Sequence, residues 1–141
     1  MQFPGPRSRR RAARAACLGL AGLAIFGARA GDTTPAQQLE RFSQQAGAPG
    51  RPGRGEAFFA ARHAGEWSCA SCHGAPPVSR GKHASTGKAI EPLAPAANPN
   101  AFTQTAKVDK WFRRNCNDVA KRECSASEKA DVMAYLLALK P

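Results

Sequence analysis

Methionine and long apolar stretches are both scarce in this sequence. Its 141 residues include two methionines, Met1 and Met133. The apolar run at residues 17–26 is too short to cross a bilayer comfortably. No segment shows the period-two alternation that is typical of a half-buried strand. We therefore expect an all-α protein with three to five helices and no membrane anchor in its mature form.

The first 30 residues have the features of an export signal. Five arginines between Arg7 and Arg14 precede the apolar run, and residues 28–30 place small side chains where a signal peptidase cleaves. Cys17 opens the run instead of closing it, which argues against a lipid anchor. We expect cleavage before Gly31, a periplasmic location and one mature domain spanning residues 31–141.

Charge is concentrated in that leader. The formal net charge is +11, but six of the 21 basic residues and none of the ten acidic ones lie in residues 1–30. The remaining 15 basic and ten acidic residues give the mature part +5. This value is ordinary for a solvated surface, and it does not favour a nucleic-acid partner.

Start signals and apolar periodicity predict four helical segments. Thr34 is a good N-cap with a proline following it, and Ser127 is the expected N-cap of the strongest helix. We expect residues 46–54 to be a linker and residues 74–101 to form a long loop that wraps around another part of the molecule. The predicted helices span residues 34–45, 55–63, 105–119 and 127–139.

The sequence Cys69-Ala-Ser-Cys72-His73 has the spacing of a covalent haem site. Two cysteines three residues apart on a helical turn present their thiols to the two vinyl groups of one haem, and the next histidine reaches the iron. A zinc site would need a second pair of ligands at matching spacing, and Cys116 and Cys124 are too far apart to provide it. A thioredoxin-like site would need strands. We therefore expect one covalently attached haem c, with Cys69 and Cys72 as its attachment residues and His73 as the proximal iron ligand.

The helices around this motif resemble those of class I cytochromes c. In that fold a glycine and an aromatic residue four positions later cross a C-terminal helix that bears an aromatic residue followed by leucine. Gly55 and Phe59 match the first pair, and Tyr135 and Leu136 match the second. The resemblance implies a class I cytochrome c-like fold, in which the sixth ligand is usually a loop methionine. The loop of this chain has none.

His63 precedes the haem motif and is interpreted as a surface residue at the end of its helix, so three residues remain as candidates for the sixth ligand. His83 lies in the long loop, whereas Met133 lies inside the last helix, where core packing is the simpler interpretation. Asn115 continues the helical series that also contains Val108, Trp111 and Phe112. A carboxamide on such an apolar face needs a polar partner, which is either backbone or the iron. The spacing alone leaves all three candidates open.

Four segments are similar to the sphaeroides haem protein family of oxygen-binding, high-spin cytochromes c. They are SCASCHG at 68–74, TGKAIEPLAP at 86–95, KWFRRNCN at 110–117 and EKADVMAYL at 128–136. The resemblance implies that Asn115, not Asn117, ligates ferric iron and leaves on reduction. It also implies a bridge between Cys116 and Cys124. His83 departs from the family pattern and keeps a bis-histidine form possible.

The resemblance further implies a function. The ferrous haem would bind O2, NO or CO, with electrons supplied by a dihaem cytochrome c, and Trp111 and Phe112 would help to wall the ligand pocket. No general acid or base stands out for catalysis, so turnover with O2 or NO stays open. The alternative is a six-coordinate electron carrier with His83 or Met133 as sixth ligand. Candidates for haem propionate or donor contacts are Arg80, Lys82, Lys88 and Lys107, of which Lys88 lies in a matching segment.

Overall fold

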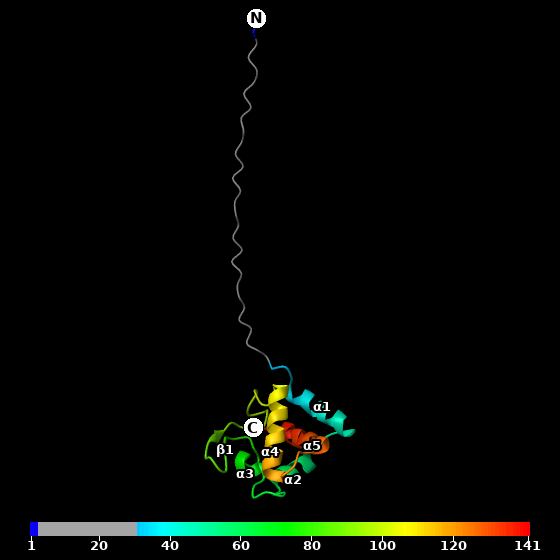
Figure 1. Cartoon of the computed structure of the whole chain (residues 1–141), viewed down its shortest axis with the longest axis vertical. Coiled ribbons are helices and arrows are strands. Elements are labelled where there is room, and N and C mark those ends of the chain that lie inside the picture. Colours follow the sequence, from blue (N-terminus) through cyan, green and yellow to red (C-terminus); the bar gives the residue numbers. More distant parts are fainter. Residues whose placement is uncertain (3–30) are drawn as a thin grey trace.

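The computed structural model describes residues 1–2 and 31–141, and the predicted export signal lies almost wholly outside that part. The described chain contains five helices and one two-stranded hairpin (Figure 1). The helices are α1 (Pro35–Ala46), α2 (Pro52–Ala60), α3 (Cys69–His73), α4 (Thr105–Ala120) and α5 (Ala126–Ala138). The fold class is therefore all-α, as the sequence predicts.

The long loop contains a small antiparallel hairpin that the sequence analysis does not predict. Strands β1 (Gly81–Lys82) and β2 (Ala89–Ile90) pair with Gly81 opposite Ile90. Two residues per strand are too few to show a period-two pattern, so sequence periodicity has no signal here. A backbone hydrogen bond, donated by His83 N to Lys88 O at 2.8 Å, extends the strand pairing toward the turn.

Two helix starts differ from prediction. Helix α2 begins at Pro52, inside the predicted linker, and ends at Ala60, before His63. Proline suits the first helical position, because its fixed φ matches the helix and its missing N–H is not needed there. Helix α5 is capped by Ser125 and not by Ser127, because Ser125 forms a reciprocal capping box with Glu128. The predicted Thr34 cap of α1 is confirmed.

Helix α5 packs between α1 and α2 (Figure 1). The crossing with α2 is very close at Gly55, where an added Cβ would lie 1.9 Å from the carbonyl oxygen of Asp131. Phe59 then reaches the ring of Tyr135, with centroids 5.6 Å apart. Phe59, Tyr135 and Leu136 share one apolar cluster with Val132. The predicted contact between the two helices is confirmed.

A second apolar cluster joins α1, α4 and α5. Phe42, Val108, Ala130 and Met133 are its buried members. Met133 is fully buried, which agrees with its interpretation as a packing residue. Phe112 packs its ring edge-on against Phe42, with centroids 5.3 Å apart. One side of the first half of α4 is thus held against the core.

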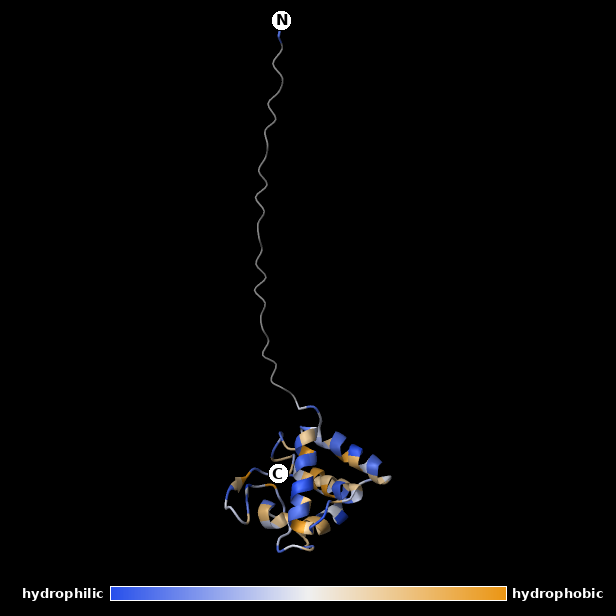
Figure 2. Ribbon diagram, in the orientation of Figure 1, coloured by the Kyte–Doolittle hydropathy of each residue, from blue (hydrophilic) through white to orange (hydrophobic). Residues whose placement is uncertain are grey.

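Polar contacts fix the N-terminal end of α4. Its N-cap residue supplies no side-chain cap, and Asp32 does this instead by accepting from Thr105 N at 2.8 Å. The buried Gln38 of α1 donates to the Thr105 hydroxyl at 3.1 Å. Arg41, which also contacts Gln38, forms an ion pair of 2.6 Å with Asp109. Much of the rest of α4 is hydrophilic, as Figure 2 shows.

Candidate functional site

A cavity of about 750 Å³ lies among α2, α3, α4, α5 and the long loop. Its volume is in the range of sites that hold a large organic ligand. Apolar side chains from several elements form much of its wall: Phe58, Phe59, Trp67, Ile90, Leu93, Phe102, Val108, Trp111, Phe112, Val132 and Leu136. The long loop thus has a surface to lie on, namely the rim of this cavity.

Helix α3 brings both motif cysteines and the histidine to the cavity. Ser68 caps this single turn, because its hydroxyl oxygen accepts a hydrogen bond from Ser71 N at 3.2 Å. In return, the backbone N–H of Ser68 donates to the hydroxyl oxygen of Ser71. Cys69, Cys72 and His73 all line the cavity, and neither cysteine forms a disulfide bond. The arrangement offers two thiols and one imidazole to the same enclosed space.

Burial shifts the pKa of two groups in this turn. Burial raises the pKa of the Cys69 thiol to about 11, so free thiolate is disfavoured. Burial also lowers the pKa of His73, with a smaller contribution from the charge of His83, and so keeps the imidazole neutral and able to ligate a metal. The buried Nδ1 atom of His73 has no hydrogen-bond partner among the described residues. The hydrogen-bonding capacity of this imidazole is therefore not fully used by the described protein residues.

The hairpin packs directly against the α3 turn. An added Cβ on Gly81 would lie 2.1 Å from the carbonyl oxygen of Cys72, so only glycine fits without a shift. The amide of Ala84 donates to the Cys72 sulfur at 3.3 Å. His83 lines the cavity between these two contacts, and its Nδ1 accepts from Thr86 N at 3.3 Å. His83 therefore lies on the α3 side of the cavity and is tied into its own turn.

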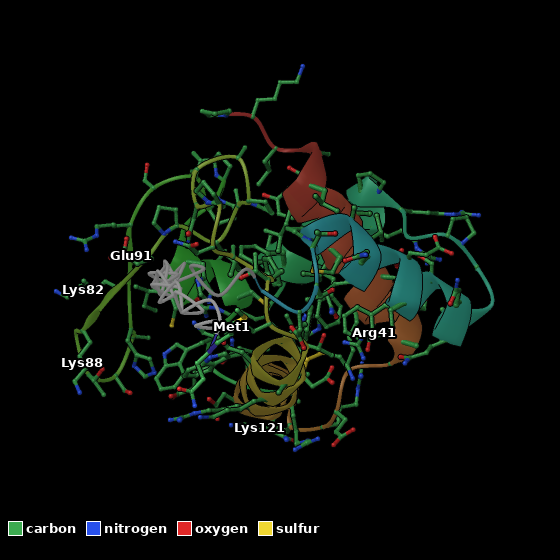
Figure 3. All side chains as sticks on the ribbon, turned by 90° about the horizontal axis from the view of Figure 1, so that it is seen from above. Met1, Arg41, Lys82, Lys88, Glu91 and Lys121 are labelled. Atoms are coloured by element: carbon green, nitrogen blue, oxygen red, sulfur yellow. A yellow bond between two sulfur atoms is a disulfide. The ribbon has the colours of Figure 1, made fainter. Side chains whose placement is uncertain are left out.

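Helix α4 contributes the candidate ligand Asn115. The residue is half-buried and lines the cavity together with Val108, Trp111 and Phe112. Its carboxamide makes no hydrogen bond within the described chain, whereas the exposed Asn117 donates to Arg113 O at 2.9 Å. Figure 3 shows α4, in yellow and nearly end-on, apart from the green α3 turn. The imidazole of His73 and the amide of Asn115 thus enter one cavity from two separate helices.

A disulfide bond joins Cys116 to Cys124 beside that amide. Their Cα atoms are 5.6 Å apart, and both residues are buried and line the cavity. The bridge connects the last turns of α4 to the segment that precedes α5. Because Cys116 directly follows Asn115, the bridge restrains the backbone next to the candidate ligand.

The four basic residues proposed for haem propionate or donor contacts differ in whether they line the cavity. Lys107 lines the cavity, whereas Lys82 and Lys88 lie at the outer edge of the hairpin (Figure 3), and neither lines it. Arg80 is exposed and pairs with Glu91. Lys88, at the outer edge of the hairpin, is thus not part of the cavity wall, and its contact with the cofactor stays a prediction.

The sequence analysis did not single out several cavity residues, of which Arg114 and Trp67 are two. Arg114 lines the cavity beside Asn115, and Trp67 lines it just before the haem motif. Helical periodicity would have placed Arg114 next to Trp111, but it does not show that this part of the helix meets a cavity. No pattern marks Trp67, since it lies in an irregular segment.

Two negative findings concern the described part of the chain. Its helices include none that combines the length and apolar character needed to cross a membrane. Within the same residues, no group of three His, Cys, Asp or Glu side chains gathers as a metal cluster.

Known proteins match this chain over most of the described residues. A family model described as "Domain of unknown function (DUF1924)" matches residues 45–136. The cytochrome c-type protein SHP of Cereibacter sphaeroides is 48% identical over 113 residues, which is 77% of this chain and 87% of that protein. The family match includes all of α2 to α4, and with them the α3 motif.

Solved structures agree with the sequence matches. The structure of oxidised SHP, described as an oxygen-binding cytochrome c, matches with a TM-score of 0.73 and 46% identity, covering 77% of this chain and all of that one. Oxidised cytochrome c'' of Methylophilus methylotrophus matches with a TM-score of 0.71 and 33% identity over 76% and 95% of the two chains. Its solution structure, with a TM-score of 0.67 and 35% identity over 76% and 94%, is concerned with haem-ligand detachment. The chain therefore belongs to the DUF1924 family together with the SHP-type cytochromes c, and it carries one covalently attached c-type haem.

Proposed function

We propose that this protein is an exported monohaem cytochrome c that binds a small gas at its ferrous haem. Cys69 and Cys72 hold the haem, His73 is the constant axial ligand, and Asn115 is the axial ligand of the ferric state. Reduction releases Asn115 and opens the sixth position for O2 or NO. The export signal at residues 1–30 directs the protein to the periplasm.

The observation that carries this proposal is the placement of Asn115. Among the three candidates, it combines a position on the cavity wall with a carboxamide that has no other partner in the described chain. A half-buried amide facing an apolar cavity is costly unless something pairs with it. Coordination of the haem iron by this amide would remove that cost.

The other two candidates fit less well. Met133 is fully buried in the cluster with Phe42 and Val108 and does not line the cavity. His83 lines the cavity, but it lies on the side of Cys72 and His73, and its Nδ1 is engaged by the Thr86 amide. Bringing His83 to the opposite side would require the hairpin to leave the α3 turn.

The donor chemistry of Asn115 supports a redox-dependent ligand. A neutral amide oxygen is a weak, hard donor, better matched to ferric than to ferrous iron. The haem supplies an iron that binds small neutral gases when reduced. The carboxamide holds the sixth position in the ferric state, and its withdrawal leaves a site walled by Trp111 and Phe112.

The described properties of two related proteins support this interpretation. SHP is described as oxygen-binding, and the solution structure of cytochrome c'' concerns detachment of a haem ligand. An electron-donor protein, of which a dihaem cytochrome c is the expected example, would maintain the ferrous state. Binding and release are sufficient for a gas-binding role, and turnover is not required.

The decisive experiment is the visible spectrum of the purified mature protein, ferric and then ferrous without air, before and after adding CO. We expect a high-spin ferrous form that takes up CO within mixing time. A low-spin ferrous form that does not take up CO would favour the six-coordinate electron carrier. In that case His83→Ala should convert the protein to a CO-binding form.

A matched pair of variants tests the ligand itself. Asn115→Ala should keep the haem attached but change the ferric spectrum to that of a five-coordinate or water-ligated iron. Asn117→Ala, two residues along the same helix and outside the cavity, should leave the spectrum unchanged. Identical ferric spectra for the wild type and Asn115→Ala would overturn the assignment.

A further inference from the structure

A cationic stripe runs along α4 at the rim of the cavity. It consists of Lys107, Lys110, Trp111 and Arg114, whose spacing places them on one helical face. The two cations nearest in sequence flank the indole, with Lys110 Nζ and Arg114 Cζ each 5.6 Å from the Trp111 ring centroid. All four side chains are exposed, and Trp111 keeps 42% of its surface accessible.

The charge of this stripe is not neutralised by the protein. Neither of the two lysines nor Arg114 forms an ion pair with a described carboxylate. Asp109, on the same helix, is engaged by Arg41 at 2.6 Å. Asp118, one turn beyond Arg114, forms no ion pair with it. By contrast, the neighbouring Arg113 lies 3.6 Å from Glu123.

The stripe also borders the redox site. Lys107, Trp111 and Arg114 line the cavity that contains His73, although they are exposed on their outer side. A molecule resting on this face would therefore contact residues that line the cofactor cavity, whereas Lys82 and Lys88 of the hairpin do not line it. Exposed tryptophan and arginine are the residue types that most often anchor protein interfaces.

We propose that the stripe on α4 is the docking surface for an acidic electron-donor protein. This inference rests on the proposed function, since it supplies the electron that releases Asn115. One electron passes from the docked donor to the ferric protein, and the neutral carboxamide of Asn115 neither gains nor loses a proton. The three cations steer the acidic partner, and Trp111 supplies the apolar centre of the contact.

The geometry favours a protein over a small anion as the occupant. A small-anion site needs several donors converging on one enclosed point, whereas these cations are spread over two helical turns and are exposed. Spread cations around one exposed aromatic side chain instead match a surface that is larger and carries several carboxylates.

The test uses reduced flavodoxin as an acidic one-electron probe in stopped-flow reduction of the ferric haem protein. Its anionic hydroquinone gives up one electron and becomes the neutral semiquinone without proton transfer. For the wild type, we expect the bimolecular rate constant to fall about tenfold or more between low and high salt. A rate that is independent of salt would overturn the proposal without any variant.

Charge-reversal variants locate the surface. Lys110→Glu should slow reduction by flavodoxin several-fold, and the double variant with Arg114→Glu should slow it about tenfold or more at low salt. Lys140→Glu is the matched control, because Lys140 is also an exposed lysine outside the cavity lining, and it should change the rate less than about twofold. Equal effects for Lys110→Glu and Lys140→Glu would show that only net charge matters and would overturn the proposal.

Two readouts separate this inference from the proposed function. Reduction by photoreduced 5-deazariboflavin, an uncharged reductant, should proceed at the same rate in the wild type, Lys110→Glu and Lys140→Glu, whose substituted residues do not line the cavity. CO uptake by the ferrous wild type tests the gas-binding role alone. Loss of CO uptake together with a localised charge effect would refute the gas-binding role but keep the docking surface. CO uptake without a localised charge effect would keep the gas-binding role but refute the docking surface.

Discussion

The close crossing of α2 over α5 makes Gly55→Ala an informative perturbation. The added methyl group would lie 1.9 Å from the Asp131 carbonyl oxygen and 2.4 Å from its carbonyl carbon. These are backbone atoms, so no side-chain rotation relieves the overlap, and α2 must move outward. Overpacking of this kind costs about 1–3 kcal/mol or more, partly offset by the roughly 1 kcal/mol that alanine contributes over glycine in a helix.

Gly53 offers a control on the same helix. A Cβ added there meets nothing within 4 Å, so Gly53→Ala should stabilise the protein by about 0.4–1 kcal/mol. Since both variants gain the alanine contribution, we expect their free energies of unfolding to differ by the overpacking cost alone, about 1–3 kcal/mol or more, with Gly55→Ala the less stable. Guanidinium unfolding of the haem-attached proteins, followed by far-ultraviolet circular dichroism, measures this difference. Equal stabilities would refute the close crossing.

Three further predictions concern α4 and α5. Replacing Cys116 and Cys124 by serine opens a loop with a sequence separation of 8 and should lower the free energy of unfolding by about 2–3 kcal/mol; denaturant unfolding that shows no loss would contradict this. The hydrogen bond from Arg122 lowers the pKa of Glu128 to about 2, so the ionised carboxylate stabilises the fold above its unfolded pKa, and this contribution is lost as pH falls toward 2. The loss of stability caused by Glu128→Gln should therefore shrink between pH 4.5 and 2. A loss that stays constant over this range would argue against the pKa shift. Met133→Leu should leave the ferric and ferrous spectra unchanged, because this buried side chain does not line the cavity, and a changed spectrum in either state would reinstate it as a ligand.

Local patterns in the sequence predict those parts of the site that depend on neighbouring residues. The spacing from Cys69 to His73 needs only one helical turn, and the structure brings all three side chains to the cavity. The same applies to α4, where the apolar period places Asn115 on the face of Val108 and Phe112. Such features can be predicted because one helix presents them without the help of another element.

Features that depend on distant segments could not be predicted in this way. The turn of Lys88 away from the cavity is set by how β1 packs on α3, through the close approach at Gly81. The position of Arg114 at the cavity rim depends on where α4 lies relative to α3. The start of α2 at Pro52 had a local signal, but the surrounding glycines and prolines favoured a linker equally well.

The way α4 is held bears on how Asn115 would leave the iron. At the N-terminal end, Asp32 and Gln38 fix Thr105 through hydrogen bonds. Near the other end, the buried Cys116 is bonded to Cys124. With both ends restrained, sliding of the whole helix would break several contacts at once, whereas rotation about the side-chain torsions of Asn115 breaks none of them. If Asn115 leaves the iron as we propose, the carboxamide would therefore withdraw by a side-chain rotation on a fixed helix, a motion that occurs far faster than a shift of the helix register.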